Sequence, residues 1–248
     1  MDEHPTIVPI RKSLKLLYGV GLAAVIGFAV IVALSVVYLR QQSERLAVTN
    51  SRSLARSLEL IFVGQINTID ALLLAASDEI EHQLSGAHGP PQRINDYLES
   101  LGSRLPYTDA IRATNAQGDI IYGSGLSSPP SNVADRDYFI QLRDDPTPGL
   151  LVVNPILSRI DTQWVWPFVR RINKADGSFA GVVFAPMRTT DIEKLLTQVQ
   201  LEHSGIIGLR DKDFGLIARY QLGGKNEIPI GDRKLSAKFR GSDRKSVV

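Results

Sequence analysis

The longest uninterrupted hydrophobic stretch of the chain covers residues 16–39, where 20 of 24 positions are apolar and none is charged. As an α-helix rising about 1.5 Å per residue, this stretch is about 36 Å long, enough to cross a hydrocarbon core of about 30 Å. A cleaved signal peptide with a processing site at residues 33–35 is the alternative, but its apolar region would exceed the usual length of about 7–15 residues. The pattern therefore predicts a single transmembrane helix.

Basic residues flank both ends of this stretch. Arg11, Lys12 and Lys15 precede it and favour a cytoplasmic N-terminus, whereas four arginines follow it within residues 40–56 and reduce the asymmetry. Because residues 1–15 are too few to carry a domain, we expect them to form a cytoplasmic tail. The chain is then a single-pass protein of the inner (cytoplasmic) membrane, anchored in lipid by one helix, with its bulk in the periplasm or outside the cell.

Residues 40–85 show a different pattern, in which apolar residues recur at spacings of three, four and their sums. No proline occurs between residues 41 and 84, so we predict one long amphipathic helix. One interpretation is that the apolar stripe of this helix packs on its own domain. The other is that part of the stripe pairs with a second copy of the chain and forms a homodimer. The two interpretations are compatible, because different parts of one long helix can do each. The stripe consists of Leu46, Leu54, Leu58, Ile61, Ile69, Leu72, Ala76 and Ile80.

Beyond this helix the hydrophobic period shortens to two, which indicates β-strands. Two short strands at residues 110–114 and 119–122 surround a turn-rich linker and are predicted to form a hairpin. Three further strands are predicted at residues 150–158, 164–172 and 179–187, joined by connections of hairpin length. Short connections require antiparallel neighbours, so the fold class is α+β with an antiparallel sheet.

Helices are expected around this sheet. One covers residues 92–105, and a second runs to residue 142 with Asp135 as its N-cap. A third is capped by Thr190 or Asp191 and ends near residue 201. We therefore expect the chain after residue 85 to form two lobes.

The first lobe contains the sheet and covers residues 86–201. The second is an incomplete lobe at residues 202–248, which begins with a hairpin formed by residues 205–209 and 215–220. The sequence contains no further apolar stretch typical of a membrane span before its last residue, so we expect only one span.

Composition narrows the possible classes of function. The 248 residues include no cysteine and carry a formal net charge of +2, which excludes a disulfide scaffold and gives no reason to expect nucleic acid as a partner. Outside residues 16–39 roughly 40% of the residues are apolar, as in ordinary soluble domains and unlike disordered chains or multi-span transporters. The four histidines are scattered without zinc-type spacing, so we expect no catalytic constellation, no metal site and no cofactor.

Large aromatic residues and an arginine share one face of the strand predicted at residues 164–172. Side chains alternate along a strand, so Trp164, Trp166, Phe168 and Arg170 point to the same side. Such a face suits a pocket for a small acid. The alternative is that Trp166 and Phe168 simply belong to the core of the sheet.

Arg136 and Tyr138 lie at the start of the short helix that is predicted to cover this sheet. A guanidinium holds a carboxylate through two parallel hydrogen bonds, and a tyrosine supplies one polar atom on an apolar body. The alternative for Arg136 is pairing with Asp135 or Asp137 at the helix end. We predict that a small organic acid or similar solute is bound by Arg136, Tyr138, Trp166, Phe168 and Arg170.

Several short motifs are similar to those of a known family. Residues 135–139 read DRDYF, residues 170–172 read RRI, and residues 176–183 read DGSFAGVV. Together with the hairpin sequences at residues 205–210 and 216–220, they resemble the double-Cache domains, a PAS-like family of extracytoplasmic sensor domains. The resemblance covers roughly residues 16–220.

This resemblance implies a receptor module. Double-Cache regions lie between two membrane helices of bacterial diguanylate cyclases, c-di-GMP phosphodiesterases, histidine kinases and chemoreceptors. They bind small organic solutes in a membrane-distal lobe and work as dimers. Residues 86–201 would be this distal Cache lobe, residues 202–248 part of the membrane-proximal lobe, and residues 40–85 the signalling helix that also forms the dimer.

The expected function is therefore that of an extracytoplasmic small-molecule sensor, the input module of a membrane-bound signal-transduction protein, and not that of an enzyme. About 48 residues remain after the distal lobe, too few for a complete second lobe. We expect the chain to be the truncated input end of a longer protein, whose output domain, if any, follows Val248. The alternative is a truncated, non-signalling, membrane-anchored module that binds a solute or a protein.

Overall fold

A computed structural model describes residues 10–86, 90–146, 149–199, 205–224 and 228–233 of the chain. The chain divides into two compact units, Met1–Leu58 and Glu59–Val248. Helix α1, Ile10–Leu84, begins in the first unit and ends in the second. The absence of proline from residues 41–84 allows this helix to continue without a break, as predicted.

Two stretches of α1 are long and apolar enough to cross a membrane. The first, Tyr18–Gln42, has no buried residues and matches the predicted span. The second, Val48–Leu84, was not expected to qualify, and it differs because part of it is buried within the protein. Leu73 and Ala76 are completely buried, so the end of α1 behaves as the core helix of a globular domain.

Within the described residues, the second unit contains an antiparallel sheet of six strands in the order β2-β1-β6-β5-β3, with β4 also paired to β5. The two long central strands, β5 and β6, pair over most of their length. Phe168 of β5 lies opposite Ala185 of β6, and Val169 lies opposite Phe184. The predicted antiparallel sheet and α+β class are thus confirmed. The strands are β1 Arg112–Thr114, β2 Ile120–Gly123, β3 Leu151–Val152, β4 Ile156–Leu157, β5 Trp164–Asn173 and β6 Phe179–Arg188.

The strand predicted at residues 150–158 is instead broken into β3 and β4. Residues 153–155 separate the two pieces. Pro155 has no backbone N–H to donate to the ladder with β5, so the pairing is interrupted at this position. The prediction of one continuous strand was wrong for this reason.

In the part of the chain that the structure describes, three short helices accompany the sheet: α2 Pro91–Gly102, α3 Asp137–Asp144 and α4 Thr189–Thr197. The predicted caps are wrong for α3 and α4. The N-cap positions are Arg136 and Arg188, neither of which makes a side-chain capping bond. Asp135 does not cap α3 because its carboxylate bonds Arg159 instead.

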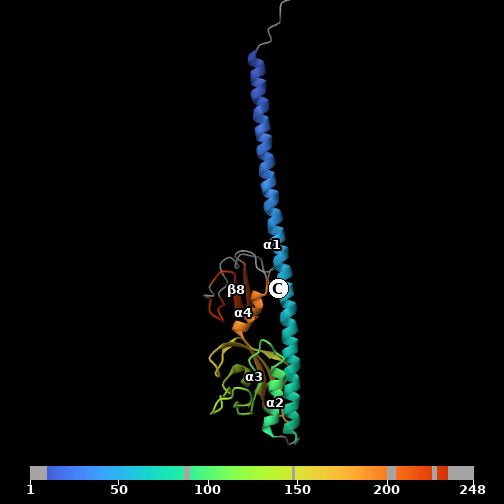
Figure 1. The fold of residues 1–248 in the computed structure, drawn as a ribbon, viewed down its shortest axis with the longest axis vertical. Helices are drawn as coiled ribbons and strands as arrows, with labels where there is room; N and C mark the ends of the chain where they lie inside the picture. The colour runs from blue at the N-terminus through green and yellow to red at the C-terminus, as the bar shows by residue number, and fades with distance from the viewer. Residues whose placement is uncertain (1–9, 87–89, 147–148, 200–204, 225–227, 234–248) are drawn as a thin grey trace, which may run out of the picture. The chain divides into compact units, whose positions relative to one another are not determined.

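The C-terminal part of α1 covers one face of the sheet. Arg170 of β5 donates from Nε to Oδ1 of Asp70 on α1 over 2.7 Å, and the backbone N–H of Asn173 donates to Oε1 of Glu81 over 2.7 Å. Helix α2 lies beside this part of α1 (Figure 1), with 3.8 Å between Nε of Arg93 and Oε1 of Glu79. Two polar bonds to β5 therefore fix α1 along this face.

Helix α3 packs on the opposite face. Tyr138, Phe139 and Leu142 of α3 join Val169 of β5 and Phe184 of β6 in one buried cluster. The helix end is also tied to β5, because Nη1 of Arg171 donates to the backbone oxygens of Leu142 and Arg143, the latter over 2.8 Å. The sheet is thus covered on both faces, by α1 on one and by α3 on the other.

A separate two-stranded sheet follows α4. Strands β7, Ile206–Arg210, and β8, Leu216–Gln221, pair antiparallel as predicted, and α4 packs against β8. Leu216 and Ile217 are almost completely buried. Most of the predicted incomplete lobe beyond residue 224 lies outside the described residues, so its extent stays a prediction.

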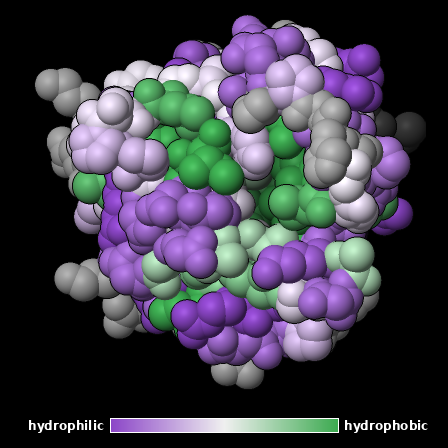
Figure 2. Space-filling view, turned by 90° about the horizontal axis from the view of Figure 1, so that it is seen from below, coloured by the Kyte–Doolittle hydropathy of each residue, from purple (hydrophilic) through white to green (hydrophobic). Residues whose placement is uncertain are grey.

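The surface seen from below is mainly hydrophilic (Figure 2). Hydrophobic side chains appear there in several separate groups between hydrophilic ones. This view contrasts with residues 18–42 of α1, where large apolar side chains such as Phe28, 70% exposed, follow one another along the helix. An exposed apolar run of this kind is typical of a segment that contacts lipid.

Candidate functional site

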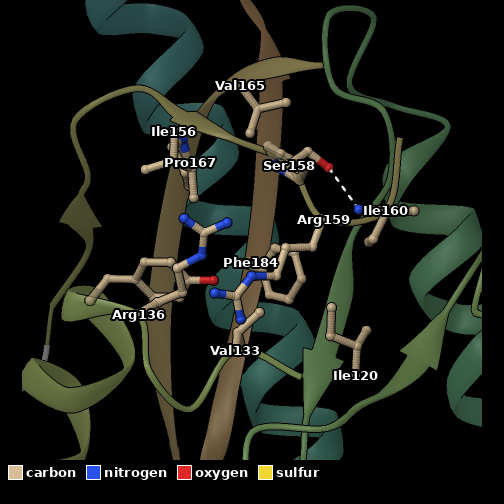
Figure 3. Close-up of a pocket in the computed structure, with 12 residues that line it drawn as sticks. Ile120, Val133, Arg136, Ile156, Ser158, Arg159, Ile160, Val165, Pro167 and Phe184 are labelled. Atoms are coloured by element: carbon tan, nitrogen blue, oxygen red, sulfur yellow. Dashed lines mark hydrogen bonds between the residues drawn. The ribbon is translucent and has the colours of Figure 1, made fainter. Parts of the chain in front are cut away.

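A small cavity of about 40 Å³ lies between the sheet and the start of α3 (Figure 3). Its polar lining consists of Arg136, Tyr138, Ser158 and Arg159. In Figure 3 both arginines extend toward the middle of the cavity, one from the start of α3 and one from the connection between β4 and β5. The rest of the lining is apolar: Ile120, Val133, Ile156, Ile160, Val165, Pro167, Phe184 and Pro186.

Arg136 is the N-cap residue of α3, in an extended backbone conformation that directs the chain into the helix. One end of its guanidinium donates from Nη2 to the backbone oxygen of Leu157 over 2.8 Å. Its Nε atom is buried and has no hydrogen-bond partner among the described residues. A buried N–H donor without an acceptor is uncommon in proteins and costs about 1–3 kcal/mol.

Arg159 forms the second cationic part of the site. Its Nη1 and Nη2 atoms donate to the two carboxylate oxygens of Asp135, each over 2.6 Å, and Nη1 also donates to the backbone oxygen of Asn132 over 2.7 Å. The hydrogen bonds from Arg159 lower the pKa of Asp135 to about 2. Asp135 is therefore ionised at neutral pH and its charge is matched by Arg159.

Tyr138 contributes the only phenol of the described lining. The side chain is buried, with 6% exposed, and burial raises its pKa to about 12. The ring belongs to the cluster between α3 and the sheet. The hydroxyl is consequently neutral at physiological pH and can donate as well as accept a hydrogen bond.

The structure brings together two of the five residues that the sequence assigned to ligand binding. Arg136 and Tyr138 line the cavity, whereas Trp166, Phe168 and Arg170 share the opposite face of β5, as the bond from Arg170 to Asp70 of α1 shows. The prediction that these three side chains lie on the same side of the strand was correct, but that side is directed toward α1 and does not line the cavity.

The alternative interpretation of the aromatic residues fits their positions better. Trp166 is 7% exposed and Phe168 is completely buried, and their rings are 4.8 Å apart at an interplanar angle of 57°. Both side chains are parts of the core. The pairing of Arg136 with Asp135 or Asp137 is not found among the described residues, because Asp135 binds Arg159 and Arg136 binds a backbone oxygen. The binding roles of all five residues remain predictions.

Sequence reasoning missed Arg159 and the apolar lining. Arg159 lies in a connection between two strands, 24 residues from Asp135, and no local motif links the two positions. Val165 and Pro167 alternate with the aromatic residues of β5, so they belong to the other face of the strand, to which the sequence analysis assigned no ligand-binding role. The alternation itself was the available signal, since it identifies both faces of a strand without saying which one meets a ligand.

The arrangement suits the binding of a small anion with an apolar part. Two guanidinium groups face apolar walls, and only the charge of Arg159 is matched by a described carboxylate. Within the described ranges, no group of three or more His, Cys, Asp or Glu residues could hold a metal ion. The site thus provides charge, hydrogen-bond donors and an apolar enclosure.

No model of a protein family matches the sequence, and a comparison with curated proteins finds no match. Solved structures do resemble it. The extracellular domain of a histidine kinase, rpHK1S-Z16, is 25% identical with a TM-score of 0.54, and the match covers 72% of this chain and 75% of that one.

Two other structures with the same fold are more distant in sequence. The ligand-binding domain of Mlp24, solved with asparagine, is 14% identical with a TM-score of 0.55, over 69% of this chain and 70% of that one. An extracellular ligand-binding receptor from Desulfohalobium retbaense is 21% identical with a TM-score of 0.53, over 72% of this chain and 31% of that one.

The fold is therefore shared with the extracellular domain of this histidine kinase and with two ligand-binding proteins. Two of these three neighbours are ligand-binding proteins. The resemblance to Cache-like sensor domains, which the sequence motifs indicated, is confirmed at the level of the fold.

Proposed function

We propose that the chain is the extracytoplasmic input module of a membrane-bound signal-transduction protein and that the lobe containing the cavity binds a small organic acid. The observation that carries this proposal is the buried, unpartnered Nε of Arg136 beside an apolar cavity. A ligand carboxylate that accepts from this Nε would remove an unfavourable buried donor. It would also supply a negative charge where the described residues provide none for Arg136.

Strand β5 is the proposed route from the ligand to α1. Val165 and Pro167 of β5 line the cavity, while Arg170 and Asn173 of the same strand bond Asp70 and Glu81 of α1. A displacement of β5 on ligand binding would therefore act directly on the helix. Signalling requires that the ligand favour one of two helix arrangements over the other.

The binding proposal is tested with the full chain in lipid nanodiscs, by isothermal titration with a panel of small mono- and dicarboxylates. For an acid that binds, Arg136→Ala should weaken affinity by about 1.5–3 kcal/mol, the cost of a charged hydrogen bond, or roughly ten- to a hundredfold in Kd. The matched control is Arg143→Ala on the same helix, whose exposed side chain pairs with Asp144.

Equal losses in the two variants would contradict the assignment of Arg136, because Arg143 is not part of the cavity lining. Failure of every acid in the panel to bind, with binding of an amine or a neutral solute instead, would overturn the proposal of an acid ligand.

The proposed topology places residues 1–15 in the cytoplasm and the sheet unit outside it. The extracellular location of the structural neighbours and the exposed apolar stretch Tyr18–Gln42 support it. A reporter that is active only outside the cytoplasm should be active when fused after Gln41. Activity of a cytoplasm-only reporter at the same position would overturn the orientation.

Dimerisation through α1 is part of the same proposal. The predicted apolar stripe divides, since Ile69 and Ala76 are buried in the lobe whereas Leu54 and Ile61 are 37% and 47% exposed. Leu54→Glu and Ile61→Glu should each convert a dimer to a monomer in light scattering of the nanodisc-free, detergent-solubilised chain. Leu60→Glu is the control, because Leu60 is 67% exposed and lies off the stripe. A monomeric unmodified chain would exclude this dimer.

A further inference from the structure

We infer that the cavity selects a short-chain carboxylate that carries no ammonium group, and so discriminates against the corresponding amino acids. This inference rests on the proposed function and concerns the same site. It follows from the charges that line the cavity, from the acceptors that are already occupied, and from the size of the cavity.

The charged groups in the described lining of the cavity are all positive. Among the described residues its lining holds two guanidinium groups and no carboxylate. The nearest acidic side chain to this pair, Asp135, accepts from both terminal nitrogens of Arg159 and is not part of the lining. Counting that pair as neutral leaves the positive charge of Arg136 unmatched.

Asp161 follows Ile160 of the lining, and its carboxylate already has several partners, including the hydroxyl of Ser158. One of its carboxylate oxygens lies 3.7 Å from Nη2 of Arg188, and the other accepts from the backbone N–H of Gln163 over 3.3 Å. A ligand ammonium would therefore bring a second positive charge next to Arg136 without meeting a free carboxylate in the described lining. Like charges in a poorly solvated site repel each other strongly.

Three neutral acceptors around the cavity already accept hydrogen bonds. The backbone oxygen of Leu157 accepts from Arg136, that of Asn132 accepts from Arg159, and Oγ of Ser158 accepts from the backbone N–H of Ile160 over 3.2 Å. An ammonium needs acceptors for three N–H groups, and burying it without them is unfavourable. A carboxylate has the opposite requirement and finds an unused donor in Nε of Arg136.

The size of the cavity limits the ligand. At roughly 10–15 Å³ for each water-sized group, a volume of about 40 Å³ holds about three such groups beyond the protein atoms. Acetate, propanoate and butanoate have four to six non-hydrogen atoms each and are the smallest straight-chain carboxylates with an alkyl part, so they are the first candidates for a cavity of this size. Because the surrounding walls are aliphatic or aromatic apart from the four polar residues, the alkyl part of such an acid would be buried against apolar side chains.

The test uses pairs of probes that differ only in the ammonium group. Acetate and glycine, propanoate and alanine, and butanoate and 2-aminobutanoate are titrated into the full chain in nanodiscs, with propanamide as the uncharged control. At least one acid should bind with a Kd at least tenfold lower than its amino counterpart, and propanamide should bind more weakly than propanoate. Arg136→Ala should remove the preference for propanoate over propanamide.

The outcomes separate the inference from the proposed function. If the amino acids bind as tightly as the acids, and Arg136→Ala weakens both, the inference is wrong while an acid-binding sensor site remains. If none of the six charged probes binds, both the inference and the short-acid version of the proposed function are overturned.

A gain-of-function variant gives an independent measurement. Ser158→Asp places a carboxylate in the lining of the cavity, so it should shift the ratio of the Kd of 2-aminobutanoate to that of butanoate at least tenfold in favour of the amino acid. Ser103→Asp, an exposed position after α2, is the control and should leave the ratio unchanged. An unchanged ratio in a folded Ser158→Asp protein would contradict the role assigned to the missing carboxylate.

Discussion

The two faces of strand β5 differ in how completely their polar and apolar groups are satisfied. On the face toward α1, Phe168 is fully buried, and Arg170 is paired with Asp70. On the face toward α3, the same strand borders a cavity in which Nε of Arg136 lacks a partner. The difference teaches that the aromatic residues of β5 complete the core, whereas the other face of the strand borders the cavity in which we propose that the ligand binds.

The largest expected effect comes from disturbing the filled face. Phe168→Ala removes a completely buried ring that contacts Trp166, and should lower the free energy of unfolding by about 3–5 kcal/mol. Chemical denaturation of the nanodisc-reconstituted chain, followed by tryptophan fluorescence, measures the change. Trp164→Ala on the same face is the comparison, because its side chain is 41% exposed and should cost much less. Equal costs would mean that this face is not a packed core.

Disturbing the cavity face should affect binding more than stability. Arg136→Lys keeps the positive charge but loses the planar pair of donors, so affinity for a carboxylate should fall by about 1–2 kcal/mol. The free energy of unfolding should change by less than about 1 kcal/mol, because the side chain leaves one donor unpaired in the parent protein. Denaturation and titration of the same preparation test both statements. A stability loss as large as that of Phe168→Ala would remove the distinction between the two faces.

Breaking the ion pair between β5 and α1 should have the next smaller effect, a loss in the free energy of unfolding. Asp70→Asn leaves Arg170, whose side chain is 15% exposed, without its carboxylate partner. Because Asp70 itself is 36% exposed, solvent moderates the loss, and we expect about 1–2 kcal/mol in the free energy of unfolding. Asp144→Asn, which breaks an exposed pair with Arg143, should change stability by less than about 0.5 kcal/mol. Reversal of this order would show that the Arg170 pair does not hold α1 to the sheet.

The smallest expected effect concerns acid stability at the cavity edge. The pKa of Asp135 is lowered from 3.8 to about 2 by its hydrogen bonds from Arg159. A lowered folded-state pKa stabilises the protein above about pH 3.8, and this contribution is lost as the pH falls toward about 2. Arg159→Gln should return the pKa of Asp135 toward 3.8, measured by carboxyl carbon chemical shifts, and should flatten the dependence of stability on pH in this interval. An unchanged pKa would contradict the pairing.

Much of the fold follows from local patterns in the sequence. The spacing of Ile69, Ala76 and Ile80 predicted a helix that buries one stripe, and these three residues are buried as expected. The alternation along β5 and β6 predicted an antiparallel pair with nearly correct ends. Such patterns record the period of the backbone, which is a local property.

The candidate site depends on pairings that local patterns do not contain. Arg136 and Tyr138 could be found because they share a short motif at the start of α3. Arg159 could not, since it reaches Asp135 only after β4 and β5 have paired. The two faces of β5 cannot be told apart from local patterns for the same reason: which face meets α1 is decided by contacts such as that between Arg170 and Asp70, far apart in the sequence.

The two bonds that join α1 to β5 also have a consequence for the order of folding. They connect residues 100 and 92 positions apart, because Arg170 binds Asp70 and Asn173 binds Glu81. Contacts across such long sequence separations form slowly, since the intervening chain must first lose much of its freedom. The helix leaves the ribosome before the sheet, yet its docking must await the synthesis of β5. The element made first therefore acquires its final packing last, and a chain interrupted before residue 170 would carry an α1 that lacks both of these bonds to the sheet.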